Sequence, residues 1–267
     1  LDANGAGLII NVSRGVTEAP DPAQAAREWR DRLEAARQEV QSPISSKSKI
    51  RVPPGRPKSK INEVIVEMFK IGAIQFKPVR LKSGLNSPYY NDLRMLSSYP
   101  RLLQAVAELM SVTMQKDGLK PDILVGIALA GIPLSTALSQ YTGIPGGYVR
   151  SERKEHGTKH MVEGVWPQGG TALLVDDVVS DGASKLEVLD HMQEAGLQVR
   201  DIVVLVDRGQ GGPDVMSRYG LKCHAGITMD AVLDVLHSEG LITAENVEES
   251  RRFMQDAQAH TRSQTDT

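Results

Sequence analysis

The stretch Ala172-Leu-Leu-Val-Asp-Asp-Val-Val-Ser-Asp-Gly-Ala-Ser184 decides the fold of this 267-residue chain. Its apolar run, residues 173–175, is typical of a strand buried on both faces of a parallel sheet. Asp176 and Asp177 then lie at the carboxyl end of that strand, which is the edge where ligands bind in open α/β sheets. Two adjacent carboxylates cannot both enter a core, so we expect at least one to accept hydrogen bonds from hydroxyls or from a group bound to a metal. The diol of a ribose fits that requirement.

The loop after this strand has the pattern of a phosphate site. It leads into a helical pattern carried by Leu186, Leu189 and Met192, so free backbone N–H groups and the positive end of a helix would face an anion. The candidate phosphate-binding residues are Ser180, Asp181, Gly182, Ala183 and Ser184. An ordinary strand-to-helix turn with solvated acids is the alternative. The length of the pattern favours a sugar-phosphate enzyme.

This motif resembles the phosphoribosyl-pyrophosphate motif of the type I phosphoribosyltransferases, and two further segments resemble orotate phosphoribosyltransferase among them. Residues 81–94, LKSGLNSPYYNDLR, are similar to that family's orotate-binding segment, and residues 150–164, RSERKEHGTKHMVEG, to its mobile catalytic loop. With Val206-Asp-Arg208, the resemblance covers about residues 60–267. It implies the α/β fold of the type I phosphoribosyltransferases: a doubly wound, mainly parallel sheet with a small hood, formed by the segment before Asp117.

The resemblance also implies the reaction. The 5-phosphoribosyl group would pass from phosphoribosyl pyrophosphate to orotate, giving orotidine 5′-monophosphate and pyrophosphate in pyrimidine (UMP) biosynthesis. Pyrophosphate leaves while positive charge develops on the ribose, so the site must neutralise the diphosphate and exclude water. Mg²⁺, held mainly by the substrate's diphosphate and by water, is the expected cofactor, and we expect no metal site built from protein ligands.

The charged segment that begins at Arg150 is expected to close over this site, because it holds many cations and a glycine and lacks apolar periodicity. By resemblance, Arg150, Lys154 and His156 contact the diphosphate, and Lys154 is the principal catalytic cation. Asp176 and Asp177 complete the expected catalytic set. The resemblance also implies a homodimer in which each subunit delivers this loop to its neighbour. Taken alone, the segment also fits a solvated surface loop.

Several positions depart from the family pattern. Ser151 stands where many relatives have a lysine, and Leu129 and Ala130 stand where bacterial relatives often have Tyr-Lys. We therefore expect backbone N–H groups to make most of the diphosphate contacts in the loop at residues 126–131. Ala183 replaces a hydroxyl residue in the phosphate loop, and Ser184 is expected to substitute for it in part. These changes are expected to alter the rate and not the reaction.

Orotate has a carboxylate and a uracil-like ring edge, and the resemblance assigns four residues to it. Lys82 and Arg208 are the expected cations, while Tyr90 and Asn91 line the ring pocket. Turn signals after Lys82, at Ser83-Gly84 and Ser87-Pro88, favour a binding loop over a solvated surface lysine. A salt bridge with Asp207 or another nearby acid is the alternative role for Arg208.

Composition agrees with a cytoplasmic enzyme. A net charge of −2 gives no reason to expect nucleic acid as a partner, and 40% hydrophobic residues suffice for a core. No apolar run of about 18 residues occurs, so we expect no membrane segment. The single cysteine, Cys223, excludes an intrachain disulfide and suits a reducing compartment. The N-terminus also lacks the pattern of a secretory signal.

The first 41 residues predict one strand, at residues 7–12, and one helix with Asp21 as its N-cap and Pro22 in its first turn. Residues 10–15, INVSRG, resemble the last strand and phosphate-binding loop of orotidine 5′-monophosphate decarboxylase, with Arg14 as the candidate phosphate ligand. The decarboxylase catalyses the next step and is found fused to the transferase. We therefore interpret residues 1–41 as a decarboxylase remnant, in the order decarboxylase first. A chance strand followed by a solvated arginine is the alternative.

Residues 42–60 hold six cations and no acid among prolines and serines, which predicts a flexible basic linker before a transferase domain at residues 61–267. A nucleic-acid-binding patch is the alternative, and the lack of aromatic residues disfavours it. Helical spacing predicts helices at residues 61–71 and 101–114. Strands are predicted at residues 123–125, 147–149, 172–175, 202–206 and 223–227.

Two other functions share part of this pattern. A type I transferase acting on a purine or uracil would keep the motif from Asp176 to Ser184 but would not need the Lys82 segment or the charged loop. A non-catalytic sensor of phosphoribosyl pyrophosphate would also keep the motif, with an attached DNA-binding segment. Residues 1–60 show no helix-turn-helix pattern, which disfavours the sensor.

Overall fold

The computed structural model describes residues 20–28, 30–31, 59–81, 84–152 and 161–265. The chain divides into two compact units, Leu1–Lys49 and Ile50–Thr267. In the first unit, residues 22–28 are helical, and Asp21 caps them by accepting a hydrogen bond from the Gln24 backbone N–H at 3.0 Å. The predicted Asp21 cap is therefore confirmed. The strand predicted at residues 7–12 and Arg14 lie outside the described residues.

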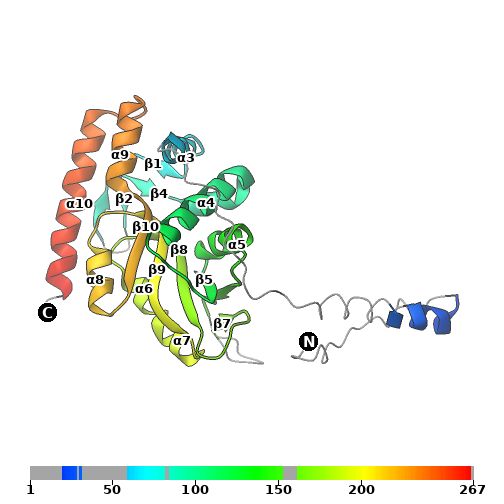
Figure 1. The fold of residues 1–267 in the computed structure, drawn as a ribbon. Helices are drawn as coiled ribbons and strands as arrows, with labels where there is room; N and C mark the ends of the chain where they lie inside the picture. The colour runs from blue at the N-terminus through cyan, green and yellow to red at the C-terminus, as the bar shows by residue number, and fades with distance from the viewer. Residues whose placement is uncertain (1–19, 29, 32–58, 82–83, 153–160, 266–267) are drawn as a thin grey trace. The chain divides into compact units, whose positions relative to one another are not determined.

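A six-stranded sheet forms the centre of the second unit, in the order β10-β9-β8-β5-β6-β7 (Figure 1). All neighbouring strands are parallel except β6 and β7, so the predicted mainly parallel sheet is confirmed. The strands are β5 (Ile123–Ile127), β6 (Gly146–Val149), β7 (Val162–Glu163), β8 (Thr171–Val179), β9 (Gln198–Asp207) and β10 (Lys222–Thr228).

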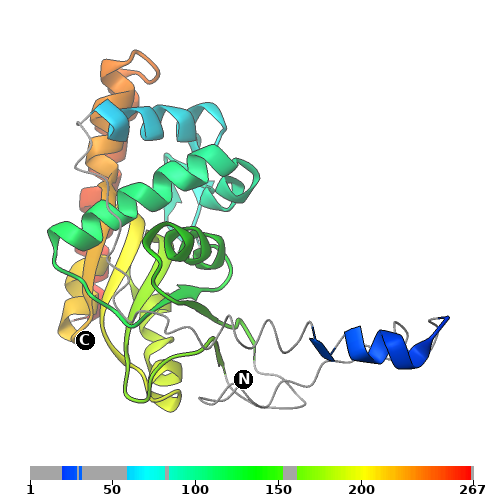
Figure 2. The ribbon, with the colours of Figure 1, turned by 45° about the vertical axis from the view of Figure 1, so that its right-hand side comes forward.

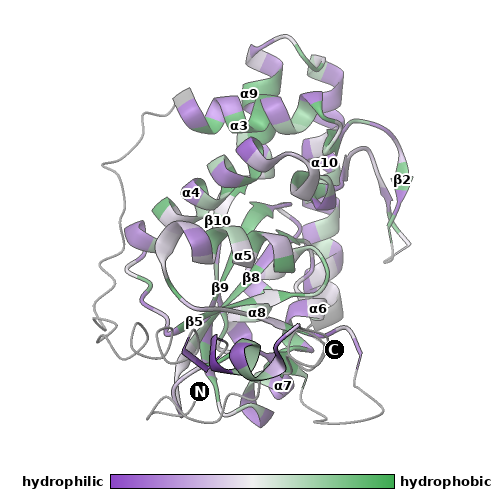
Figure 3. Cartoon of the chain, turned by 90° about the vertical axis from the view of Figure 1, so that its right-hand side faces the viewer, coloured by the Kyte–Doolittle hydropathy of each residue, from purple (hydrophilic) through white to green (hydrophobic). Residues whose placement is uncertain are grey.

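The buried strands contribute to two cores, one on each face of the sheet. Along β8, Leu173 and Val175 belong to one core, while Leu174 belongs to the other, because successive side chains of a strand point to opposite faces. Figure 3 shows hydrophobic residues along the central strands and hydrophilic residues on much of the helical surface. This alternation explains why the sequence of β8 shows an uninterrupted apolar run.

Helices cover both faces of the sheet. The first core receives side chains from α3 (Ser59–Lys70), α4 (Pro100–Lys116), α5 (Gly131–Thr142) and α9 (Met229–Ser238), and Figure 2 shows α3, α4 and α5 stacked on one side. The second core receives side chains from α7 (Leu189–Glu194) and α8 (Gly212–Arg218). The single turn α6 (Ala183–Leu186) precedes α7, and the long helix α10 (Ala244–Thr265) packs against α8 and α9.

A small hood meets the sheet where β9 ends. It consists of two antiparallel strand pairs and the 3-10 helix η1 (Leu93–Ser98), and the Tyr89 hydroxyl donates a hydrogen bond to the backbone carbonyl of Arg208 at 3.1 Å. The pairs are β1 (Ile74–Gln75) with β4 (Tyr90–Asn91) and β2 (Val79–Arg80) with β3 (Asn86–Ser87). The hood is smaller than predicted, because the buried stripe of α4 packs that helix into the first core instead.

Candidate active site

Strand β8 carries both aspartates inside its length, whereas the sequence predicted a strand that ends before them. Val178 and Val179 continue the pairing with β9, opposite Val206 and Asp207, because β-branched residues fit a pleated ladder. The aspartates still lie near the carboxyl end of the strand. The predicted position of the aspartates at the carboxyl edge of the sheet is therefore confirmed, whereas the predicted end of the strand is wrong.

Asp176 is the more buried of the two aspartates, although it also lines the cavity described below. Its carboxylate is buried, and its Oδ2 accepts a hydrogen bond from the Nζ of Lys185, a residue of α6. Its Oδ1 accepts a hydrogen bond from the Asp177 backbone N–H at 2.9 Å. Both oxygens of Asp176 are therefore occupied by partners of this chain. Sequence analysis did not identify Lys185, since a lysine in the first turn of a helix is usually solvated.

Asp177 is the more open carboxylate of the two. Its Oδ1 accepts a hydrogen bond from the Val178 backbone N–H at 2.8 Å. Burial and then the negative charge of Asp176 raise the pKa of Asp177 to about 7, against the opposing charge of Lys185. A carboxyl group with a perturbed pKa in a cavity is a candidate for a functional role.

A cavity of about 420 Å³ opens beside these aspartates. It brings together seven predicted site residues from four parts of the chain: Leu129, Ala130, Arg150, Ser151, Asp176, Asp177 and Ser184. Lys185, Glu187 and His191 also line it and were not predicted. Lys154 and His156 lie outside the described residues. The size and the mixed charge of the cavity fit a sugar-phosphate ligand.

Arg150 lines the cavity and forms an ion pair with Glu163. Its Nε donates to Oε1 of Glu163 at 2.7 Å, across the antiparallel pair β6–β7. Opposite it, the turn before α5 supplies Leu129, which is 72% exposed, and Ala130. These two side chains add no charge to the wall, so backbone groups are the polar atoms that this turn can offer.

The predicted phosphate loop makes a tight turn between β8 and α6. Gly182 has a φ of 84°, and a Cβ atom there would lie 3.0 Å from the Gly212 carbonyl oxygen, so only glycine fits. The Ala183 backbone N–H donates to Oδ1 of Asp181 at 3.1 Å, which uses one of the amides expected to face an anion. The helix that follows, α6, is one turn long. Ser184 lines the cavity, while the Ser180 hydroxyl faces Arg208 at 3.4 Å.

Arg208 is a buried cation directly after β9. Only 7% of the residue is exposed, and its guanidinium lies 5.0 Å from the ring centroid of Tyr89 in the hood. Its NH2 donates to the Ser87 hydroxyl at 3.3 Å, and its Nε has no hydrogen-bond partner. Among the described residues, no carboxylate forms an ion pair with Arg208, and Asp207 instead accepts a hydrogen bond from the Gly209 backbone N–H. The salt bridge considered from the sequence is therefore not formed.

The remaining predicted orotate residues are in the hood. Tyr90 accepts a hydrogen bond from NH2 of Arg94 at 3.1 Å, and both polar side-chain atoms of Asn91 are buried without partners. Neither residue lines the cavity beside Asp177. Arg94 has a raised pKa, mainly because it is paired with Asp92 and in smaller part because of the Asp177 charge, so this side of the hood faces β8. Lys82 lies outside the described residues.

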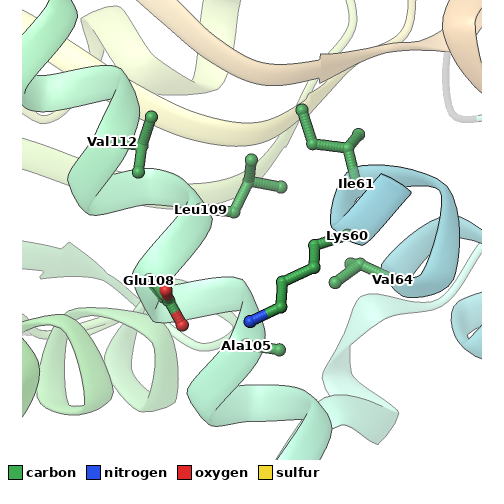
Figure 4. A pocket seen from close by; sticks show the side chains of 7 residues that line it. All are labelled: Lys60, Ile61, Val64, Ala105, Glu108, Leu109 and Val112. Carbon is green, nitrogen blue, oxygen red and sulfur yellow. The ribbon is translucent and has the colours of Figure 1, made fainter. Parts of the chain in front are cut away.

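A second hollow lies between α3 and α4 and is not part of this site (Figure 4). Apolar side chains dominate its wall, with Lys60 and Glu108 at its edge. Its volume of about 50 Å³ is too small for a sugar phosphate. Within the described part of the chain, no cluster of three or more histidine, cysteine or acidic side chains could hold a metal ion. No described helix has the length and apolar character needed to cross a membrane.

Comparison with known proteins agrees with this geometry. The model of the phosphoribosyl transferase domain family matches residues 93–223. The chain is 38% identical over 196 residues to the uridine 5′-monophosphate synthase of Bos taurus, covering 73% of this chain and 41% of that protein. It is also 38% identical over 172 residues to the orotate phosphoribosyltransferase of Caenorhabditis elegans, covering 64% of this chain and 74% of that protein.

Solved structures give the same picture. The UMP synthase of Leishmania donovani has a TM-score of 0.68 and 30% identity, covering 95% of this chain and 51% of that one. The orotate phosphoribosyltransferase of Aeropyrum pernix has a TM-score of 0.59 and 30% identity, covering 67% of this chain and 99% of that one. The chain thus spans less than two thirds of either synthase but most of the single-function enzymes. It belongs to the orotate phosphoribosyltransferase family.

Proposed function

We propose that this chain transfers the 5-phosphoribosyl group from phosphoribosyl pyrophosphate to orotate and releases pyrophosphate. The observation that carries the proposal is Arg208, a buried guanidinium that no described carboxylate pairs with. A buried charge that is not balanced by an opposite charge is costly, so the site is suited to an anionic ligand. The carboxylate of orotate would supply that charge at the edge of the sheet where the ribosyl donor is proposed to bind.

The chain's own groups divide the work of the proposed reaction. Asp177 would accept a hydrogen bond from a ribose hydroxyl, and the loop at residues 180–184 would hold the 5-phosphate. Lys154 and His156, with Arg150, would contact the diphosphate and exclude water from the charged transition state. Lys82, Tyr90 and Asn91 would surround orotate with Arg208. Mg²⁺ would be held mainly by the donor's diphosphate and by water, where it would neutralise the leaving group.

The relation to a longer bifunctional protein is also a proposal. The Leishmania donovani UMP synthase structure matches 95% of this chain. Residues 61–267 make up a smaller part of the chain, so the match also includes residues before them. This supports the interpretation of residues 1–41 as the end of a decarboxylase domain and residues 42–60 as a linker. A phosphate ligand such as Arg14 is not by itself a catalyst. Residues 1–41 contain no Asp-x-Lys-x-x-Asp run, so we expect no decarboxylase activity from these residues themselves.

The proposed acceptor is tested by following orotate consumption with phosphoribosyl pyrophosphate and Mg²⁺, in the parent chain and in Arg208→Met. Loss of a charged hydrogen-bonding partner should cost about 2 to 3 kcal/mol and raise the KM for orotate well above tenfold, with the donor KM unchanged. Arg200→Met is the matched control, since Arg200 is exposed near the other end of β9. Turnover with uracil or a purine, or donor binding without turnover, would contradict the proposal.

The proposed homodimer is tested by complementation. Lys154→Ala should lower turnover by about two orders of magnitude or more, as for loss of a preorganised charge. Mixing Lys154→Ala with Asp177→Ala protein should restore activity, because a shared loop leaves one intact site in each mixed dimer. If confirmed subunit exchange restores nothing, the loop does not act across subunits.

A further inference from the structure

Lys185 is buried in the wall of the candidate active site, in a pattern unusual for a lysine. It is 8% exposed, and its ammonium forms an ion pair with Asp176, whose side chain is 5% exposed. Buried ion pairs contribute little to stability, because the loss of hydration offsets the attraction. Both partners line the cavity that also contains Asp177. This placement points to a role in the site.

The two adjacent aspartates are therefore not equivalent. Lys185 and the Asp177 backbone N–H occupy the two oxygens of Asp176, whereas Asp177 accepts one backbone hydrogen bond and faces the cavity. We propose that Lys185 is a positioning residue that fixes the Asp176 carboxylate in its ion pair and leaves Asp177 as the more open carboxylate, the one that accepts the donor's hydroxyl hydrogens. The inference rests on the proposed function and assigns unequal roles within its donor site.

Several charged groups surround Asp177, and they determine how the loss of Lys185 would change its protonation. Asp176 stands beside Asp177 on β8, and Glu187 and His191 line the wall beyond α6. Arg150 also lines the cavity, in its pair with Glu163. Arg94 belongs to η1 of the hood, which contacts β8. Lys185 is the cation that opposes the negative charge of Asp176. Its loss would leave two neighbouring carboxylates, which favours a shared proton. A protonated Asp177 cannot accept a hydroxyl hydrogen bond at that oxygen, so donor binding would then require a higher pH.

The test compares Lys185→Met with Lys185→Arg by measuring kcat/KM for the donor across pH. Lys185→Met should move the acidic limb of this profile upward by about one pH unit, equivalent to about tenfold weaker use of the donor below that limb. The KM for orotate should change less than about twofold, because Arg208 lies in another part of the site. Lys185→Arg should restore the parent profile, since it keeps the cation. The proposal would be overturned if Lys185→Met kept both the acidic limb and the donor KM of the parent. It would also be overturned if only the KM for orotate changed.

A double variant removes the ambiguity of a folding defect. Asp176→Asn with Lys185→Met takes away both charges of the buried pair, so no uncompensated charge stays in the core. Its acidic limb should return to that of the parent or below, because Asp177 loses its like-charged neighbour. If the double variant keeps the upward shift of the acidic limb seen in Lys185→Met alone, Lys185 does not act through Asp176. If the parent chain is inactive with orotate and the donor, the proposed function is wrong. If the parent is active but the variants give the contradicting outcomes, only the inference about Lys185 is wrong.

Discussion

Two ionic clusters occupy opposite ends of the parallel strands and are built differently. The carboxyl-end cluster is Asp176, Asp177 and Lys185, beside the cavity. The amino-end cluster is Asp117, Asp201 and His224, where α4 ends and β9 and β10 begin. In the amino-end cluster, Nδ1 of His224 lies 2.7 Å from Asp117 Oδ2, and Nε2 lies 2.8 Å from Asp201 Oδ1. A doubly protonated imidazole can donate to both carboxylates at once.

The difference separates a structural cluster from a functional one. His224 is 3% exposed and both of its ring nitrogens have partners, so it ties a helix to two strands. Asp201 also lines a separate cavity of about 210 Å³, but neither His224 nor Asp117 lines that cavity. The carboxyl-end cluster leaves Asp177 facing a cavity with a raised pKa. Satisfied charges stabilise the fold, whereas a perturbed charge beside a cavity is available for chemistry. The comparison predicts opposite consequences for mutations at the two ends.

The largest effect is expected at Asp177. Asp177→Asn should lower kcat/KM by about 100-fold or more, equivalent to about 3 kcal/mol, because the amide cannot replace an ionised acceptor in the site. Its free energy of unfolding, measured in urea, should stay equal to that of the parent or rise, since the like-charge contact with Asp176 is removed. Asp190→Asn, at an exposed position of α7, is the control. A strongly destabilised Asp177→Asn protein would place this carboxylate with the structural cluster.

An intermediate effect of the opposite kind is expected at His224. His224→Leu should lower the free energy of unfolding by about 2 to 3 kcal/mol, because two charge-assisted hydrogen bonds are lost. The activity of the molecules that stay folded should match that of the parent. His260→Leu, on the exposed side of α10, is the control for an exposed histidine. If activity falls while stability holds, the amino-end cluster is coupled to the site and the comparison fails.

The smallest effect is a pH dependence of stability from Asp117. Its hydrogen bond with His224 lowers the pKa of this carboxyl below the ordinary value. A depressed pKa in the folded state adds stability that is complete above the unfolded pKa, about 4, and is lost as pH falls through the folded pKa. Urea unfolding of the parent at decreasing pH should show this loss, and His224→Leu should show less of it. If the free energy of unfolding falls equally with pH in the two proteins, the hydrogen bond with His224 does not lower the Asp117 pKa.

Sequence patterns predicted the sheet well because its strands are buried on both faces. The predicted strands at residues 123–125 and 202–206 lie inside β5 and β9, and the helices at residues 61–71 and 101–114 correspond to α3 and α4. Boundaries were less accurate. β8 runs four residues beyond the apolar run that predicted it, because β9 supplies a partner for Val178 and Val179 that no local pattern contains.

Several contacts that sequence analysis did not identify join positions that are far apart in the chain. Asp117 and His224 are 107 residues apart, and the hydroxyl of Tyr89 meets the Arg208 carbonyl across 119 residues. Lys185 is only nine residues from Asp176, but its burial follows from the tight turn at Gly182, which aims α6 back toward β8. The motif therefore predicted the kind of ligand, while the folded chain decides which carboxylate is open to it.

The helix α10 supports the surroundings of Arg208. Phe253 of α10 packs edge-on against the Tyr89 ring at 5.8 Å, and Gln258 donates to the Gly209 carbonyl at 2.9 Å, next to Arg208. A premature stop codon before Phe253 would thus remove part of the frame that holds Arg208, even though every residue of the phosphate motif would still be translated. In genetic screens, such late truncations would therefore test the proposed role of Arg208 in substrate recognition. For protein engineering, a fusion partner should follow this helix and not replace it.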